Sequence, residues 1–180
     1  KGINKSPAIF DPMKMNWLNG LYIKEMDFDA FMDYATPFIQ KTKVAGKYDM
    51  VKLCKLLQGR IEFFGDIGDK VDFLEEFGEY DTELYINQKQ KSDNEIAVTV
   101  LPHVLETLKS VETWENSALY EALKNLAVSL NLKNSQILWP TRIAISGRDS
   151  TPGGATELAE LIGKNETIKR LKFSIELLNK

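Results

Sequence analysis

The chain has 180 residues, of which 26 are acidic and 23 are basic, giving a formal net charge of −3. This balance argues against a protein that coats nucleic acid unselectively, although a local basic patch with specific base contacts remains compatible with it. Hydrophobic residues make up 43% of the chain, which is enough for a core in one domain or two small ones. No apolar run reaches the roughly 20 residues that a membrane helix needs.

The first half of the sequence has the periodicity of several short helices. Residues 1–10 look like an extended segment, and Asp11-Pro12 is typical of a helix start, because aspartate caps and proline fits the first turn. Asp27 is the expected cap of the next helix, in which Pro37 predicts a kink or an early end. Further helical segments are expected at about residues 49–64, then at 71–77 and 84–86.

The most polar run, QKQKSD at residues 88–93, is the expected boundary between two lobes, residues 1–90 and 91–180. The second lobe shows helical spacing throughout, and Thr113 is the expected cap of its second helix. We find no alternating strand pattern and no repeat of 20 to 50 residues. The predicted fold is therefore all-α, with helices packed in two small bundles. In the second lobe, helices are expected at residues 94–109, 114–130, 138–146, from about 155, and after 165.

The stretch Leu138–Leu158, LWPTRIAISGRDSTPGGATEL, is the most informative part of the sequence. An apolar helix carrying Arg142 breaks at Gly147, a polar loop follows, and a second helix begins near Ala155. The loop contains Arg148, Ser150, Thr151, Pro152, Gly153 and Gly154.

This loop has two interpretations. Gly153 and Gly154 can adopt positive φ and allow a ligand or another backbone to approach closely. The second helix would direct its free N–H groups at the same place, so arginine, hydroxyls and amides together suit an anionic or base-like partner. Taken alone, however, the residues favour a plain helix–loop–helix corner in which Arg142 extends its charged end to solvent.

Enzymatic or metal chemistry finds no support in the sequence. His103 is the only histidine and has no cysteine or histidine at ligand spacing, and neither a GxSxG nor a GxxxxGK[ST] motif occurs. The single cysteine, Cys54, excludes an internal disulfide, suits a reducing compartment, and lies where a helical core residue is expected. The three tryptophans occupy apolar helix positions and are expected to be core anchors rather than base-stacking platforms; they are Trp17, Trp114 and Trp139.

Several long motifs resemble the bacterial-type glutamyl-tRNA synthetases, which are class I aminoacyl-tRNA synthetases. LWPTRIAISG and TPGGATELAELIGK resemble the C-terminal signature of that family, and NKSPAIFDP, NWLNG and LQGRI fit it too. The resemblance covers nearly the whole chain but concerns the anticodon-binding part alone. It implies that residues 1–90 hold the end of the stem-contact region and a first helical anticodon-binding lobe, and that residues 91–180 form a second such lobe.

The resemblance also implies a partner and a site. The partner would be tRNA(Glu), not DNA or a membrane, and unpaired anticodon bases would be read along their edges. Arg142 would read the first anticodon base, Thr151 and Pro152 would contact the middle base, and Arg60 would read the third. The other members of the candidate anticodon-binding set are Arg148, Ser150 and Gly153.

The ATP-binding motifs of the family, of the HIGH and KMSK types, are absent from this sequence. The resemblance therefore implies that this polypeptide does not aminoacylate tRNA alone, that ATP and magnesium belong to a catalytic half of a longer parent enzyme, and that this chain needs no cofactor or metal. It further implies a cytoplasmic monomer. The alternative hypothesis is a helical protein-interaction module that does not bind RNA.

Overall fold

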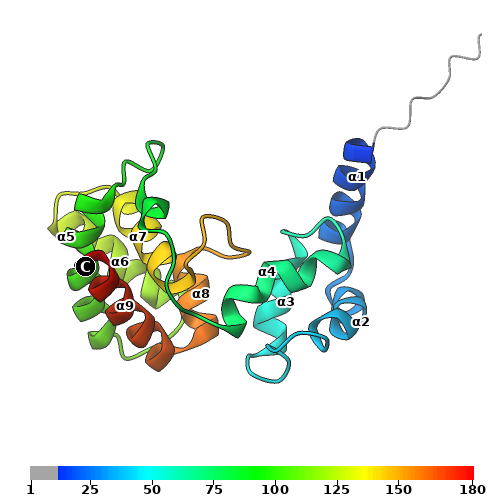
Figure 1. Cartoon of the computed structure of the whole chain (residues 1–180). Helices are drawn as coiled ribbons and strands as arrows, with labels where there is room; N and C mark the ends of the chain where they lie inside the picture. The colour runs from blue at the N-terminus through cyan, green and yellow to red at the C-terminus, as the bar shows by residue number, and fades with distance from the viewer. Residues whose placement is uncertain (1–11) are drawn as a thin grey trace, which may run out of the picture.

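The computed structural model describes residues 12–180 (Figure 1). Within this range the chain forms nine α-helices and two short 3-10 helices, and it contains no strand, only an isolated bridge between Asn87 and Ser92. The all-α prediction is therefore confirmed. The expected extended segment and the expected cap Asp11 lie outside the described residues. None of the helices in residues 12–180 is both long and apolar enough to span a membrane.

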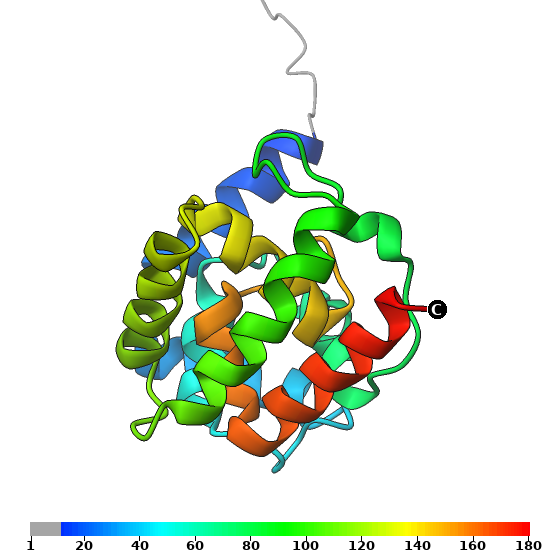
Figure 2. The ribbon, with the colours of Figure 1, turned by 90° about the vertical axis from the view of Figure 1, so that its left-hand side faces the viewer.

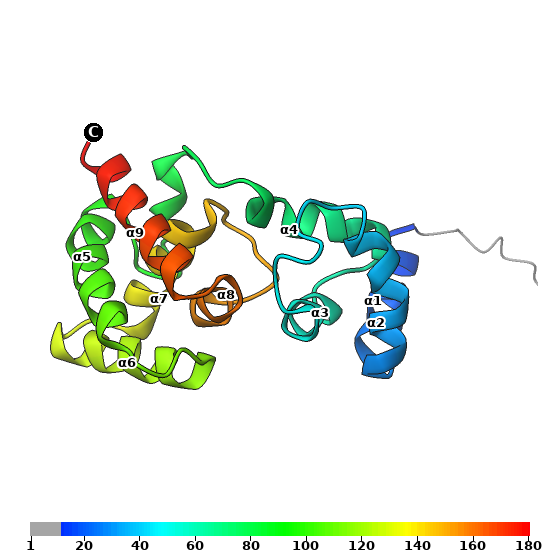
Figure 3. The same ribbon diagram turned by 90° about the horizontal axis from the view of Figure 1, so that it is seen from below.

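The helices gather in two groups (Figures 1 and 3). The first helical group consists of α1 (Pro12–Glu25), α2 (Phe28–Ile39), α3 (Met50–Gln58), η1 (Phe64–Asp66) and α4 (Ile67–Glu75). The second helical group consists of η2 (Thr82–Tyr85), α5 (Asn94–Ser110), α6 (Asn116–Ser129), α7 (Asn134–Ser146), α8 (Ala155–Ile162) and α9 (Lys164–Leu178).

Each group has its own apolar centre. In the first group, α2 packs on α3 and α4, and Phe31 meets Phe64 with ring centroids 5.6 Å apart. Cys54 is buried there, and burial raises the pKa of its thiol to about 11, so it behaves as the small core residue that was predicted. In the second group, α7 contacts α5, α6, α8 and α9, while α5 and α9 lie side by side (Figure 2). Fully buried side chains of this centre include Leu101, Leu123, Ile137 and Ile143.

The predicted cap Asp27 is confirmed, and Asp49, where the next helix was expected to begin, caps α3. Asp27 accepts hydrogen bonds from the backbone N–H groups of Asp29 and Ala30 at 3.0 and 3.2 Å, and Asp49 accepts one from Lys52 at 2.8 Å.

Several predicted boundaries are wrong, and the helices expected at residues 71–77 and 138–146 both begin four residues earlier, as Ile67–Glu75 and Asn134–Ser146. Thr113 does not cap α6, which begins after Glu115. The helix predicted for residues 49–64 ends at Gln58, because a turn follows in which the Asp66 carboxylate accepts from the N–H groups of Glu62 and Phe63 at 3.2 and 2.9 Å. Arg60 therefore lies just after α3 instead of on it.

The tryptophans do not behave alike. Trp114 and Trp139 are half-buried, and their indole N–H groups donate to the carbonyls of Ala159 and Leu84 at 2.8 and 3.2 Å. Trp17 on α1 is 58% exposed, so the prediction that it anchors the core is wrong. Its helical spacing is regular, but α1 meets the rest of the first group through Ile23 and Asn19 instead; Ile23 is buried and Asn19 donates to the carbonyl of Glu62.

A pair of glycine substitutions tests how α7 ends. Gly147 and Gly46 both have positive φ, of 63° and 73°, so alanine at either position should cost about 1–2 kcal/mol of backbone strain. A Cβ at Gly147 would also lie 3.0 Å from Cδ1 of Tyr80, whereas a Cβ at Gly46 meets nothing within 4 Å. We therefore predict that Gly147→Ala lowers the free energy of unfolding in urea more than Gly46→Ala does. Equal losses would show that the Tyr80 contact does not constrain this turn.

Candidate nucleic-acid interface

The segment that joins α7 to α8, residues 147–154, lies between the two helical groups (Figures 1 and 3). We call it the site loop. Its start is fixed by Ser146, whose hydroxyl donates to the carbonyl of Arg142 at 2.7 Å and accepts from the N–H of Arg148 at 3.2 Å. Its end is fixed by Glu157, which accepts from the N–H of Gly154 at 2.7 Å. This bond occupies one of the amides at the start of α8 that the sequence suggested for a ligand.

Arg142 is half-buried, and the protein holds its guanidinium in place. The group lies over the ring of Trp139, 4.5 Å from the ring centroid, and Nη2 donates to the carbonyl of Asp149 at 2.6 Å. Burial lowers the pKa of Arg142 from its ordinary value, the charge of Asp149 raises it, and the positive charge of Arg60 lowers it. The side chain is thus a pre-oriented planar cation, which suits contacts to flat polar groups.

A cavity of about 480 Å³ adjoins Arg142 and the start of α8. Its walls carry aromatic rings, side-chain amides, one cation and the carboxylate of Glu157, a combination suited to a flat ligand with polar edges. The residues that supply these groups are Gln90, Asn116, Tyr120, Trp139 and Arg142.

A second cavity, of about 380 Å³, adjoins the first half of the site loop. The loop contributes Ser150, Thr151 and Pro152, and the first helical group contributes Arg60 and Lys70. With Lys24 from α1, three cations line this cavity against one carboxylate, that of Glu62. Although the net charge of the chain is negative, positive charge is therefore concentrated at this cavity, which favours an anionic ligand.

The structure separates the predicted site residues into three sets. Arg142 lines the first cavity, whereas Arg60, Ser150, Thr151 and Pro152 line the second. Two others attach the site loop to the first helical group: Arg148 pairs with Asp72 of α4 at 2.6 Å, and Gly153 packs against Leu56 of α3, which would lie 3.1 Å from an added Cβ.

The glycines of the loop differ from the prediction in their backbone conformation and in what approaches them. Neither Gly153 nor Gly154 has positive φ, whereas Gly147 does. The close approach at Gly153 comes from a neighbouring side chain of the protein itself, and Gly154, not Gly153, lines the first cavity.

Sequence analysis missed several residues that line the cavities. Lys24 and Lys70 come from α1 and α4, and Gln90 and Tyr120 come from the segment before α5 and from α6. No local pattern marks them, because each belongs to a different element and the fold alone brings them together. In residues 12–180, no group of three or more histidine, cysteine and acidic side chains is placed to hold a metal ion.

Comparison with known families shows which family the chain belongs to. The family described as "Anticodon binding domain" matches residues 30–175. The chain belongs to the anticodon-binding domain family. This confirms the resemblance that the motifs predicted.

Relatives of this anticodon-binding domain agree with that assignment. The glutamate–tRNA ligase of Clostridium acetobutylicum is 40% identical over 178 residues, which is 99% of this chain and 37% of the relative. The glutamate–tRNA ligase of Clostridium botulinum strain Eklund 17B is 44% identical over 180 residues, again 99% of this chain and 37% of the relative. The chain thus spans a little over a third of the length of these proteins.

The fold has solved counterparts. A glutamate tRNA ligase from Elizabethkingia meningosepticum, crystallised with its amino acid, superposes with a TM-score of 0.75 at 24% identity. That alignment covers 93% of this chain and 32% of the other. At this identity the likeness concerns the fold alone.

The Arg148–Asp72 ion pair allows a quantitative test. Both side chains are about half exposed, 51% and 46%, so solvent screens the pair and its contribution to stability should be no more than about 1 kcal/mol. We predict a coupling energy of that size in a double-mutant cycle of Asp72→Asn and Arg148→Gln, measured by urea unfolding, and a decrease of that energy in high salt. A coupling of several kcal/mol that ignores salt would mean that Arg148 serves the fold and is not free to meet a phosphate.

Proposed function

We propose that this anticodon-binding domain recognises the anticodon loop of tRNA(Glu), as part of a glutamate–tRNA ligase that joins glutamate to its tRNA with ATP. The names of its relatives, at about 40% identity over nearly the whole chain, support this assignment. ATP and magnesium would then belong to the remaining part of such an enzyme. We also propose a cytoplasmic monomer, and the division at residues 90 and 91 stays a prediction.

The observation that carries the proposal is the placement of two arginines around one loop. Arg142 on α7 and Arg60 after α3 line neighbouring cavities that share the site loop, and the charge of Arg60 influences the pKa of Arg142. Sequence-specific RNA recognition usually targets unpaired bases that are splayed apart and bonded along their edges. Two cavities, each lined by at least one cation and by part of the site loop, suit adjacent splayed bases of an anticodon.

We assign the bases accordingly. Arg142, already stacked on Trp139 and oriented by the Asp149 carbonyl, reads the first base. Thr151 and Pro152 contact the middle base, and Arg60 reads the third. Ser150 is exposed on the same loop. Lys24 and Lys70 supply positive charge for contacts to phosphates, which position an RNA without reading its sequence.

Substitutions at Arg142 test this assignment. A bidentate arginine–base contact contributes about 1–3 kcal/mol of discrimination, so Arg142→Ala should weaken binding of a glutamate anticodon stem–loop by that amount. The loss should vanish when the first anticodon base is already replaced. Arg142→Lys should behave like Arg142→Ala, because lysine keeps the charge but lacks the planar fork. Binding is measured by filter retention at fixed salt, with melting curves recorded for each variant.

Two further variants serve as controls. Arg60→Gln should alter the dependence on the third base and leave the dependence on the first unchanged. Lys172→Ala, on the exposed side of α9 and outside both cavities, should bind like the wild type. If Arg142→Lys also binds like the wild type, charge alone matters and base reading by Arg142 is refuted. If Arg142→Ala unfolds the domain, Arg142 is a structural residue at the end of α7.

A further inference from the structure

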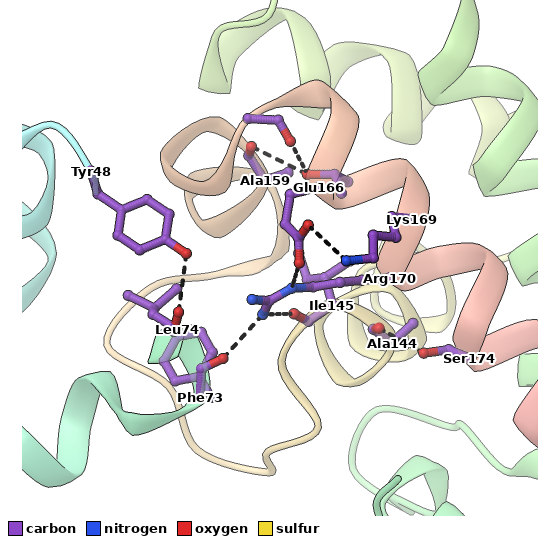
Figure 4. A network of polar contacts seen from close by, with 12 residues as sticks. Tyr48, Phe73, Leu74, Ala144, Ile145, Ala159, Glu166, Lys169, Arg170 and Ser174 are labelled. Carbon is purple, nitrogen blue, oxygen red and sulfur yellow. Dashed lines mark hydrogen bonds and ion pairs between the residues drawn. The ribbon is translucent and has the colours of Figure 1, made fainter. Parts of the chain in front are cut away.

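Arg170 lies in the middle of α9 and is 3% exposed. Its Nε donates to Glu166 at 2.9 Å, and its Nη1 donates to the carbonyls of Ile145 and Phe73 at 2.8 and 3.2 Å (Figure 4). The guanidinium also lies over the ring of Phe77, 4.6 Å from the ring centroid. A buried cation is therefore supplied with a carboxylate, two carbonyls and an aromatic face.

The two carbonyls belong to different helical groups. Phe73 is in the last turn of α4, and Ile145 is in the last turn of α7. Carbonyls at helix C-termini carry partial negative charge and lack helical partners, so they attract a cation. One side chain from α9 thus joins the ends of α4 and α7.

The same two helices carry the cations of the candidate interface. Phe73 follows Lys70 by one turn on α4, and Ile145 follows Arg142 by one turn on α7. Lys70 lines the second cavity and Arg142 lines the first. Arg170 lines neither, yet it ties together the backbones that present both.

Other cross-group contacts are more exposed. The Lys52–Glu160 pair joins α3 to α8 at 3.0 Å with side chains 44% and 22% exposed, and Arg148–Asp72 is about half exposed. Solvent screens such pairs and long side chains hold them loosely. Within the described residues, Arg170 is the buried charged side chain, and its hydrogen bond to the Phe73 carbonyl crosses from the second group to the first.

We propose that Arg170 is a positioning residue for anticodon recognition: it fixes the orientation of the first helical group relative to the second, so that both cavities engage one RNA loop at once. The inference rests on the proposed function. A pre-set orientation spares the ordering cost of binding, whereas loosely joined groups would have to be aligned by the RNA itself. Arginine suits the role because its planar fork can serve several acceptors, which a lysine ammonium does not match.

The test separates orientation from folding. Removing Arg170 alone would leave Glu166 without its buried partner, so the variant combines Arg170→Met with Glu166→Gln, which removes both charges and keeps volume. Spin labels are attached at Asp33→Cys on α2 and Val128→Cys on α6, both exposed positions, in a Cys54→Ala background. Pulsed electron paramagnetic resonance then gives the distance distribution between the groups, and helix content is followed by circular dichroism.

In the spin-labelled protein that keeps Arg170 and Glu166, we expect a narrow distance distribution. In the Arg170→Met, Glu166→Gln variant we expect a broader or shifted one, with helix content retained. Binding of the glutamate anticodon stem–loop should weaken by about 2- to 30-fold, with reduced discrimination at both the first and the third base. Adding the stem–loop should narrow the distribution again. The matched control is Lys169→Met, since Lys169 pairs with the same Glu166 at 3.8 Å but is 79% exposed; it should change neither quantity.

An unchanged distribution would overturn the proposal, and so would a broadened distribution with unchanged base discrimination. If circular dichroism shows that the double variant unfolds, Arg170→Lys is measured in its place, and the same outcomes decide. Failure of the proposed function can be distinguished from failure of this inference. In the first case the protein with Arg170 and Glu166 intact would show no base preference, although the distance measurement would still report on Arg170.

Discussion

The guanidinium of Arg170 is the most deeply buried of the charged groups that join the two halves of this domain within the described residues. Removing a cation from water is costly unless several partners replace the lost hydration, and here Glu166, Phe73, Ile145 and the Phe77 ring all do so. Two of these partners are backbone carbonyls, whose positions depend on whole helices. The contact is therefore satisfied only when α4, α7 and α9 meet in one arrangement, which links the electrostatics of one side chain to the geometry of the whole interface.

The site loop is likewise held by contacts within the protein. These contacts fix its backbone and leave some of its side chains exposed to solvent. Tyr80 packs against Gly147, Leu56 packs against Gly153, and Glu157 binds the Gly154 amide. These contacts come from both helical groups, so the path of the loop depends on their alignment. The loop then leaves Ser150 exposed and Thr151 partly exposed beside Arg60. For the proposed function, these contacts would orient the loop for specific rather than general contacts to RNA, which suits a chain of net charge −3.

The periodicity of apolar residues was enough to predict the helices, and the Asp27 cap followed from local chemistry. Periodicity failed where the outcome depends on what lies opposite a helix: Trp17 has regular spacing but is exposed. Arg170 escaped prediction for a related reason. Its spacing to Glu166 is that of an ordinary exposed pair on a helix, and its other partners are carbonyls far along the chain. Arg142 could be predicted as a candidate site residue because a long motif surrounds it, whereas Lys24 and Lys70 have no such context.

The central claim is that this domain reads the anticodon of tRNA(Glu), and an exchange of anticodon loops between two tRNAs tests it most directly. One hybrid carries the glutamate anticodon loop on an unrelated tRNA, and the other carries the unrelated loop on tRNA(Glu). Both are titrated against the domain by filter binding at two salt concentrations. The account predicts that the hybrid with the glutamate anticodon loop binds more tightly, and that binding weakens as salt rises. Equal and weak binding of both hybrids with little dependence on salt would contradict it, and would favour a helical protein-interaction module.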